Sequence, residues 1–124
     1  MAGERILVVE DNELNMKLFH DVLHATDYTT LKAYTGEEAV ELAVSHVPAL
    51  VLMDVQLPGI DGVATLATLR GDERTAAIRV LALTAQAMHG DRTRFLDAGF
   101  DGYLSKPVDV AELLHTVEEL CRRG

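Results

Sequence analysis

The chain contains three short runs of apolar residues in which polar residues do not alternate. These runs are Ile6 to Val9, Leu50 to Met53 and Val80 to Leu83. Runs of this kind are typical of strands that are buried on both faces of a parallel sheet. Two further segments, Thr29 to Tyr34 and Gly102 to Leu104, contain the β-branched or aromatic residues that favour a strand. The pattern therefore predicts five strands.

Between these runs, apolar residues recur at the spacing of amphipathic helices. In the first helix we expect the buried face to consist of Leu14, Leu18, Phe19, Val22 and Leu23. In the third helix we expect it to consist of Val63, Leu66 and Ala67. The last helix shows the pattern most clearly, at Val110, Leu113, Leu114, Val117, Leu120 and Cys121. Thr35 to Glu38 and Asp109 to Glu112 have the spacing of capping boxes, which predicts where the second and last helices begin.

Strands and helices thus alternate in five β-α units of about 25 residues each, a spacing that suits right-handed crossovers in a parallel sheet. We predict an α/β fold with a doubly wound, five-stranded parallel sheet. No linker-like or low-complexity segment divides the chain, so we expect residues 1–124 to form a single domain.

The amino-acid composition is consistent with this predicted fold and limits the cellular compartment and the partners that we expect. The 124 residues are 48% apolar and 25% charged, as in an ordinary globular domain. The longest apolar run is far shorter than the roughly 20 residues that a membrane helix needs, so we expect a soluble protein without a membrane partner. Cys121 is the only cysteine, and no signal peptide is evident, which favours a reducing cytoplasm. The net charge of -9, without a long basic stripe, argues against nucleic acid as a partner.

Ionisable and hydroxyl side chains follow four of the predicted strands. Glu10 and Asp11 follow the first strand, Asp54 the third, Thr84 the fourth and Lys106 the fifth. In open parallel sheets, ligands bind beyond the carboxyl ends of the strands, so these side chains are expected to converge at one edge.

Singly, each of these residues has an ordinary explanation, such as a helix cap for Asp11 or a solvated loop cation for Lys106. Together they raise a charge problem, because two like charges about 4 Å apart repel by roughly 4 kcal/mol at an effective dielectric constant near 20. Either one acid stays protonated or a cation with oxygen ligands, such as Mg²⁺, joins the cluster. Lys106 and Thr84 are donors suited to a phosphoryl group at the same place.

Four motifs in this order give the chain a resemblance to the receiver domains of two-component response regulators, over essentially its whole length. They are VVEDN at residues 8–12, LMDVQLPGIDG at 52–62, LTA at 83–85 and YLSKP at 103–107. The stretch from Val9 to Asp21 is similar to the DivK type of single-domain receiver in bacterial cell-cycle signalling. The resemblance implies a flavodoxin-like, CheY-like (βα)5 fold with strand order 2-1-3-4-5.

The resemblance also implies roles for individual residues. Asp54 would be the phosphoacceptor, Lys106 would pair with the phosphoryl charge, and Thr84 and Tyr103 would form the switch. The Mg²⁺ ligands would be Asp11, Asp54, the backbone carbonyl of Gln56 and, through water, Glu10. Glu10 stands where the family often has aspartate, so its reach to the metal differs. A cis peptide bond is expected at Lys106-Pro107.

By the same resemblance, a sensor histidine kinase or phosphotransferase would phosphorylate Asp54. A downstream protein would then read the face made by the fourth helix, fifth strand and fifth helix of a monomer or weak dimer. We expect a signalling domain that assists only its own phosphorylation and slow dephosphorylation. An aspartyl-phosphate hydrolase would carry a second aspartate where this chain has Gln56. A degenerate receiver that serves as a docking module and a flavodoxin-like cofactor binder remain as alternatives.

Overall fold

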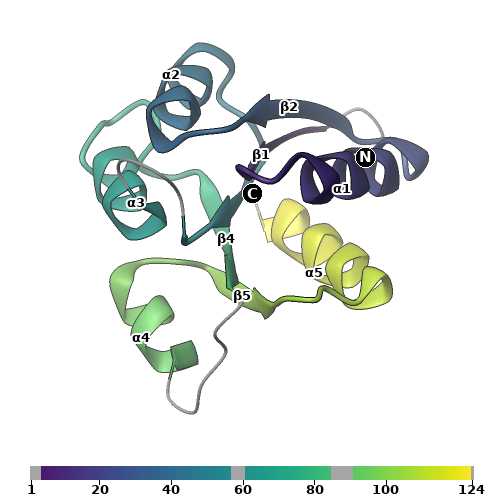
Figure 1. The fold of residues 1–124 in the computed structure, drawn as a ribbon. Coiled ribbons are helices and arrows are strands. Elements are labelled where there is room, and N and C mark those ends of the chain that lie inside the picture. The colour runs from purple at the N-terminus through teal and green to yellow at the C-terminus, as the bar shows by residue number, and fades with distance from the viewer. Residues whose placement is uncertain (1–3, 57–60, 85–90, 124) are drawn as a thin grey trace.

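The computed structural model describes residues 4–56, 61–84 and 91–123 and contains one parallel sheet (Figure 1). Its strands are β1 (Arg5–Val9), β2 (Thr29–Ala33), β3 (Leu50–Asp54), β4 (Arg79–Thr84) and β5 (Gly102–Ser105). They are hydrogen-bonded in the order β2-β1-β3-β4-β5. The predicted fold class, strand positions and strand order are therefore confirmed.

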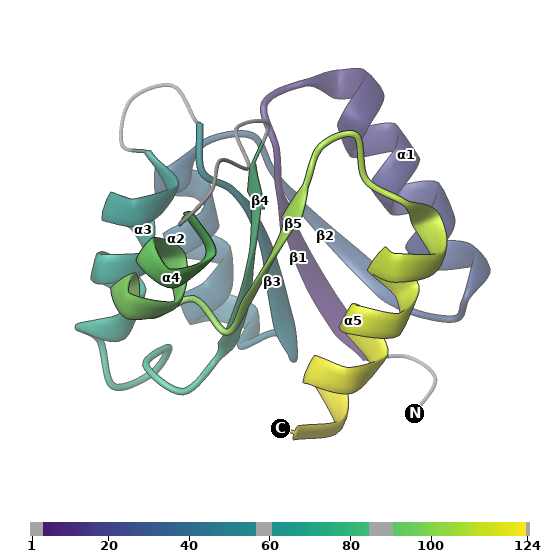
Figure 2. The same ribbon diagram turned by 90° about the horizontal axis from the view of Figure 1, so that it is seen from below.

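Helices cover both faces of this sheet, as the two views in Figures 1 and 2 show. They are α1 (Glu13–Ala25), α2 (Gly36–His46), α3 (Gly62–Arg70), α4 (Asp91–Ala98) and α5 (Val110–Arg123). α1 and α5 pack on one face, and α2, α3 and α4 pack on the other. Within the described residues, no helix combines the length and the apolar character that a membrane crossing requires.

The strands are buried on both sides because alternate residues enter two separate cores. Leu7 and Val9 of β1 pack in the core beneath α2, α3 and α4. Ile6 and Val8 pack in the core beneath α1 and α5. This double burial explains why the sequence of the central strands shows no polar alternation.

The two predicted helix starts are confirmed, with one difference in detail. Thr35 Oγ1 accepts a hydrogen bond from the N–H of Glu38 at 3.1 Å, and Asp109 Oδ1 accepts one from Glu112 at 3.0 Å. The Glu38 carboxylate, however, accepts from the N–H of Tyr34 at 2.8 Å, whereas a capping box would use the N–H of Thr35. The chain enters α2 in an extended conformation that brings the earlier N–H within reach.

The predicted buried face of α1 is partly wrong. Leu14 and Leu18 have exposed fractions of 80% and 45%, whereas Met16, Phe19 and Leu23 are buried. These three residues stand at positions i, i+3 and i+7, so α1 has a second apolar stripe of helical spacing, and this stripe faces the sheet.

The predicted face of α3 is also partly wrong. Val63 and Ala67 are exposed, whereas Leu66 and Leu69 are buried. Thr65 takes a buried place that the hydrophobic pattern could not reveal, because its hydroxyl donates a hydrogen bond to the carbonyl of Asp61 at 2.8 Å. A satisfied hydroxyl can be buried at little cost.

Arg70, at the end of α3, joins three segments at the amino-terminal end of β4 and β5. Its guanidinium donates hydrogen bonds of 2.6 to 3.0 Å to the carbonyl oxygens of Ala76, Ile78 and Gly99 and to the carboxylate of Asp101. Asp101 Oδ2 also accepts from the N–H of Val80 at 2.8 Å. This network fixes the turn between α4 and β5 against the start of β4.

We expect the substitution Arg70→Ala to lower the free energy of unfolding by about 2–3 kcal/mol, because it leaves the half-buried carboxylate of Asp101 and several carbonyls without their donor. Arg74→Ala is the matched control. It removes an ion pair with Asp72 at the protein surface, where solvent screens the attraction, so the loss of stability should be much smaller. Urea denaturation of the two variants measures the difference, and equal losses would contradict the structural role of Arg70.

Candidate functional site

The register of the central strands brings two acidic side chains together at the carboxyl end of the sheet. Val9 of β1 lies beside Met53 of β3, so Glu10 and Asp54 occupy the next matching positions. Both are buried, with exposed fractions of 0% and 4%. Val8 and Leu52 pack toward α1 and α5. Glu10 and Asp54 come two residues later along the chain in each case, so their side chains point to the same side. Two carboxylates therefore meet on the same side of the sheet.

Lys106 lies between these two carboxylates. Its ammonium is 3.0 Å from Oε1 and from Oε2 of Glu10 and 3.0 Å from Oδ2 of Asp54. Asn15 Nδ2 donates a second hydrogen bond to Glu10 Oε1 at 2.7 Å, and the backbone N–H of Gln56 donates to Asp54 Oδ1 at 2.9 Å. Each buried carboxylate is thus held by a charged donor and a neutral donor.

Asp11 adds a third, exposed carboxylate at the rim. One oxygen from each of Glu10, Asp11 and Asp54 lies within 4.8 Å of the others. Such a set of carboxylate oxygens is the donor chemistry that Mg²⁺ prefers, with water completing the coordination. The single ammonium of Lys106 cannot balance three carboxylates, so the charge of the cluster also fits a divalent cation.

The protonation of Glu10 reflects this imbalance. Burial, together with the hydrogen bond to Asp54, raises the pKa of Glu10 from 4.5 to about 7. Burial alone would lower the pKa of Lys106, but its hydrogen bonds to Glu10 and Asp54 outweigh burial and raise this pKa above 10.5. Lys106 therefore stays charged, while Glu10 takes up a proton near pH 7 when no metal is present.

Thr84 and Tyr103 lie on the other side of the sheet, toward α4. Thr84 is 2% exposed at the end of β4. Its side chain points to the same face of the sheet as those of Val80 and Ala82, which pack in the core beneath α2, α3 and α4. Tyr103 is half-buried, and its ring centroid is 5.9 Å from that of Phe95 in α4. The two predicted switch residues therefore share one face of the sheet.

The backbone connects this face to the charged cluster. The N–H of Lys106 donates to the carbonyl of Thr84 at 2.7 Å, and the expected cis bond at Lys106-Pro107 is present. A cavity of about 410 Å³ next to α4 is lined in part by Gln56, Thr84 and Arg94. Residues 57–60 and 85 of the quoted motifs lie outside the described residues.

The sequence interpretation missed what two residues contribute. Asn15, in the first turn of α1, donates a hydrogen bond to Glu10. The sequence indicates this contact only by an amide side chain that stands one helical turn after the acidic pair Glu10 and Asp11. Gly62 begins α3 close to the end of β3, and a Cβ atom there would lie 2.6 Å from the carbonyl oxygen of Asp54 and from the Cα atom of Val55. Only glycine allows the chain to return so closely to Asp54.

Comparison with known proteins gives consistent matches over most of the chain. The model of the response regulator receiver domain family matches residues 6–118. The polar-differentiation response regulator DivK of Brucella ovis is 44% identical over 113 residues, which are 91% of this chain and 92% of that protein.

Solved structures agree with these matches. The receiver domain of the sensor histidine kinase PA1611 from Pseudomonas aeruginosa, with a magnesium ion coordinated in its active site cleft, superposes with a TM-score of 0.89 and 35% identity. That comparison covers 97% of this chain and 98% of the other. The receiver domain of the Francisella response regulator 1452 gives a TM-score of 0.91 at 26% identity and covers 98% of both chains.

The raised pKa of Glu10 predicts how pH affects stability when divalent cations are removed. The folded protein holds the proton of Glu10 more tightly than the unfolded chain does, with a pKa of about 7 against 4.5. This contribution is complete below the unfolded pKa and is lost as pH rises through about 7, which lowers the free energy of unfolding by up to about 3 kcal/mol. Urea denaturation in a chelator between about pH 5 and about pH 8 measures this slope.

Glu10→Gln should flatten this slope, because the amide does not titrate. Glu37→Gln, at an exposed position of α2, is the control and should keep it. Unchanged slopes in both variants would show that Glu10 is already ionised in the metal-free protein.

Proposed function

The chain belongs to the family of response regulator receiver domains, and from this premise we propose that Asp54 accepts a phosphoryl group from a phosphohistidine of a sensor histidine kinase or phosphotransferase. The observation that carries the proposal is the contact of Lys106 with Asp54, 3.0 Å long, at a rim shared with Glu10 and Asp11. An ammonium beside one buried carboxylate, within an acidic cluster, suits the transfer of a phosphoryl group to that carboxylate.

The proposed metal ligands are Asp11, Asp54 and the backbone carbonyl of Gln56, with Glu10 acting through water. Both oxygens of Glu10 already accept hydrogen bonds from Lys106, and Asn15 donates to one of them, which suits an indirect role. When bound, Mg²⁺ would supply positive charge to the phosphoryl oxygens. The magnesium ion in the related PA1611 receiver domain supports this assignment.

In the proposed reaction an oxygen of Asp54 attacks the phosphorus in line with the bond to the donor imidazole. The new P–O bond forms an acyl phosphate, and the electron pair of the broken P–N bond remains on the imidazole nitrogen. Gln56 orients the Asp54 carboxylate through its N–H. Lys106 is placed to exchange its contact with the free carboxylate for one with the phosphoryl oxygens.

Thr84 and Tyr103 would turn this reaction into a signal. The phosphoryl group offers the Thr84 hydroxyl a charge-assisted hydrogen bond that exists only after transfer, which favours one of two conformations. Movement of Thr84 toward the acceptor frees space on the side of β4 that faces Tyr103 and Phe95. Tyr103 would then turn inward and change the face made by α4, β5 and α5.

Rapid turnover is not part of the proposed function. The position two residues after Asp54 carries Gln56, which cannot act as a general acid or base. Gln56 lines a cavity together with Thr84, and its N–H bonds to the Asp54 carboxylate, so it would orient water for a slow hydrolysis of the acyl phosphate. The chain would thus act as a signalling domain that assists only its own phosphorylation and slow dephosphorylation.

The phosphodonor protein would dock on α1. Leu14 and Leu18 are large apolar residues that remain exposed on this helix, and α1 begins two residues after Asp11. Exposed apolar residues beside a reactive group are typical of a protein contact. By analogy with the 44% identical DivK, we place the chain in cytoplasmic control of cell polarity and the cell cycle, as a monomer or weak dimer.

A small phosphodonor tests the acceptor directly. Incubation with acetyl phosphate and Mg²⁺ should add one phosphoryl group to the protein, as detected by intact mass, and removal of Mg²⁺ with a chelator should slow the reaction at least about tenfold. Asp54→Asn should accept nothing, because its amide is a poor nucleophile. Asp21→Asn, which alters an exposed acid of α1, should react normally. Phosphorylation of the Asp54→Asn protein would refute the assignment.

The α1 contact makes a separate prediction, because a protein donor must dock whereas acetyl phosphate need not. Leu14→Ser should slow phosphotransfer from a phosphorylated histidine phosphotransferase about tenfold and leave the rate with acetyl phosphate unchanged. Val47→Ser, at an exposed apolar residue that follows the carboxyl end of α2, is the control and should change neither rate. Equal rates for wild type and Leu14→Ser with the protein donor would place docking elsewhere.

A further inference from the structure

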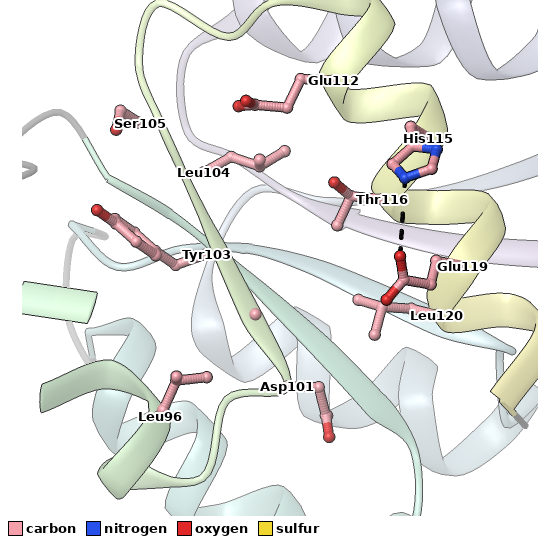
Figure 3. A pocket seen from close by; sticks show the side chains of 11 residues that line it. Leu96, Asp101, Tyr103, Leu104, Ser105, Glu112, His115, Thr116, Glu119 and Leu120 are labelled. Carbon is pink, nitrogen blue, oxygen red and sulfur yellow. Dashed lines mark ion pairs between the residues drawn. The ribbon is translucent and has the colours of Figure 1, made fainter. Parts of the chain in front are cut away.

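The carboxylate of Glu10 is held from two directions. Figure 3 shows that the side chain of Leu104 points toward α5, whereas that of Tyr103 points away from it. Lys106 comes two residues after Leu104, so its ammonium reaches Glu10 from the side of the sheet that α1 and α5 cover. Asn15 reaches the same carboxylate from the first turn of α1. Glu10 therefore depends on two donors that come from separate elements.

These donors are divided unequally between the two oxygens of Glu10. Lys106 Nζ lies 3.0 Å from Oε1 and 3.0 Å from Oε2, so it does not distinguish one oxygen from the other. Asn15 Nδ2 donates to Oε1 alone, at 2.7 Å. Because a carboxylate oxygen offers two lone pairs, Oε1 is fully used. Within the described part of the chain, Oε2 accepts only the bond from Lys106 and keeps a lone pair for one more donor.

The side chain of Asn15 starts from a backbone that is already fixed. Asn12 caps α1, and its Oδ1 accepts a hydrogen bond from the backbone N–H of Asn15 at 3.0 Å. Asn15 thus stands where the glutamate or glutamine of a capping box would turn back to the helix start. Here the side chain turns back to Glu10 instead. Since its backbone is held, little further freedom is lost when the amide binds the carboxylate.

The length of Glu10 makes this second donor necessary. A glutamate has one more rotatable bond than an aspartate, so its carboxylate has more orientations to lose when it is fixed. The symmetric contact with Lys106 leaves open which oxygen turns toward Asp11 and Asp54. The bond from Asn15 removes this freedom, because it commits Oε1 to the side of α1.

We propose that Asn15 is a positioning residue for the cation site: it fixes the rotation of the Glu10 carboxylate, so that Oε1 stays with its two donors and Oε2 stays available to a water molecule on the cation. This inference deepens the proposed function and rests on it only in taking Glu10, Asp11 and Asp54 as the cation site. Groups that orient the ligands of a metal in this way contribute to its affinity although they do not touch it.

Magnesium binding tests this role directly. NMR titration of the Asn15→Ala protein with MgCl₂, followed at the amide signals of Asp11 and Gln56, should give a dissociation constant about tenfold higher than that of the wild type. Ser45→Ala is the matched control, because it also removes one side-chain hydrogen bond from a helix, at an exposed position of α2. The control should bind Mg²⁺ as the wild type does. Wild-type affinity in Asn15→Ala would overturn the inference.

A second substitution separates positioning from damage to α1. Glu10→Asp draws the carboxylate back by about 1.5 Å, the length of one carbon–carbon bond, and so breaks its contact with Asn15. In the Glu10→Asp protein, the further change Asn15→Ala should therefore alter the Mg²⁺ affinity less than about twofold. An equal, tenfold loss with Glu10 and with aspartate at this position would mean that Asn15 acts only through the fold of α1, which would also overturn the inference.

Phosphorylation by acetyl phosphate distinguishes this inference from the proposed function. Because Asn15 acts through Glu10 and not on the reacting carboxylate of Asp54, Asn15→Ala should reach the wild-type rate at saturating Mg²⁺ but need about tenfold more Mg²⁺ for half of that rate. A protein that accepts phosphate but whose Mg²⁺ affinity does not depend on Asn15 would overturn the inference alone. A protein that shows this dependence but never accepts phosphate would instead overturn the proposed function.

Discussion

Two buried carboxylates share one ammonium group at the carboxyl end of the sheet, and the rest of the site depends on this arrangement. Glu10 and Asp54 are removed from water, which is costly for two like charges unless positive charge lies close by. Lys106 contacts both, yet the pKa of Glu10 is still raised to about 7. One ammonium is therefore not enough, and a proton or a metal cation must supply the remainder. A site with this deficit responds to any ligand that changes its charge, as a phosphoryl group does.

The same constraint explains why the site stands where it does. Each central strand is apolar throughout because it is buried on both faces, and ionisable residues can begin only where the strand leaves the core. Pairing of β1 with β3 then sets Glu10 beside Asp54, and pairing of β4 with β5 brings Lys106 to the same end. Gly62 lets the chain turn back closely over Asp54. The site thus follows from strand register more than from any local motif.

This dependence on register decides how much the sequence could predict. The strands and the convergence of Glu10, Asp11, Asp54 and Lys106 were predictable, because buried strands and their polar ends are visible in the hydrophobic pattern. The strand order came only from the resemblance to receiver domains. The buried face of α1 was not, since that helix has two apolar stripes and only packing selects the one with Met16. The support of Glu10 by Asn15 was also hidden. It depends on how α1 approaches the end of β1, which no spacing along one segment specifies.

The paired strands β4 and β5 form a unit whose two ends are held differently. At one end, Arg70 and Asp101 fix the turn between α4 and β5 to the start of β4. At the other end, the link is the hydrogen bond from Lys106 to the carbonyl of Thr84. If Asp54 is phosphorylated as proposed, Thr84 and Lys106 gain a new partner at that end, while the Arg70 end stays in place. Tyr103 lies between these ends and contacts Phe95 of α4, so a change at Thr84 would reach the surface of the protein there.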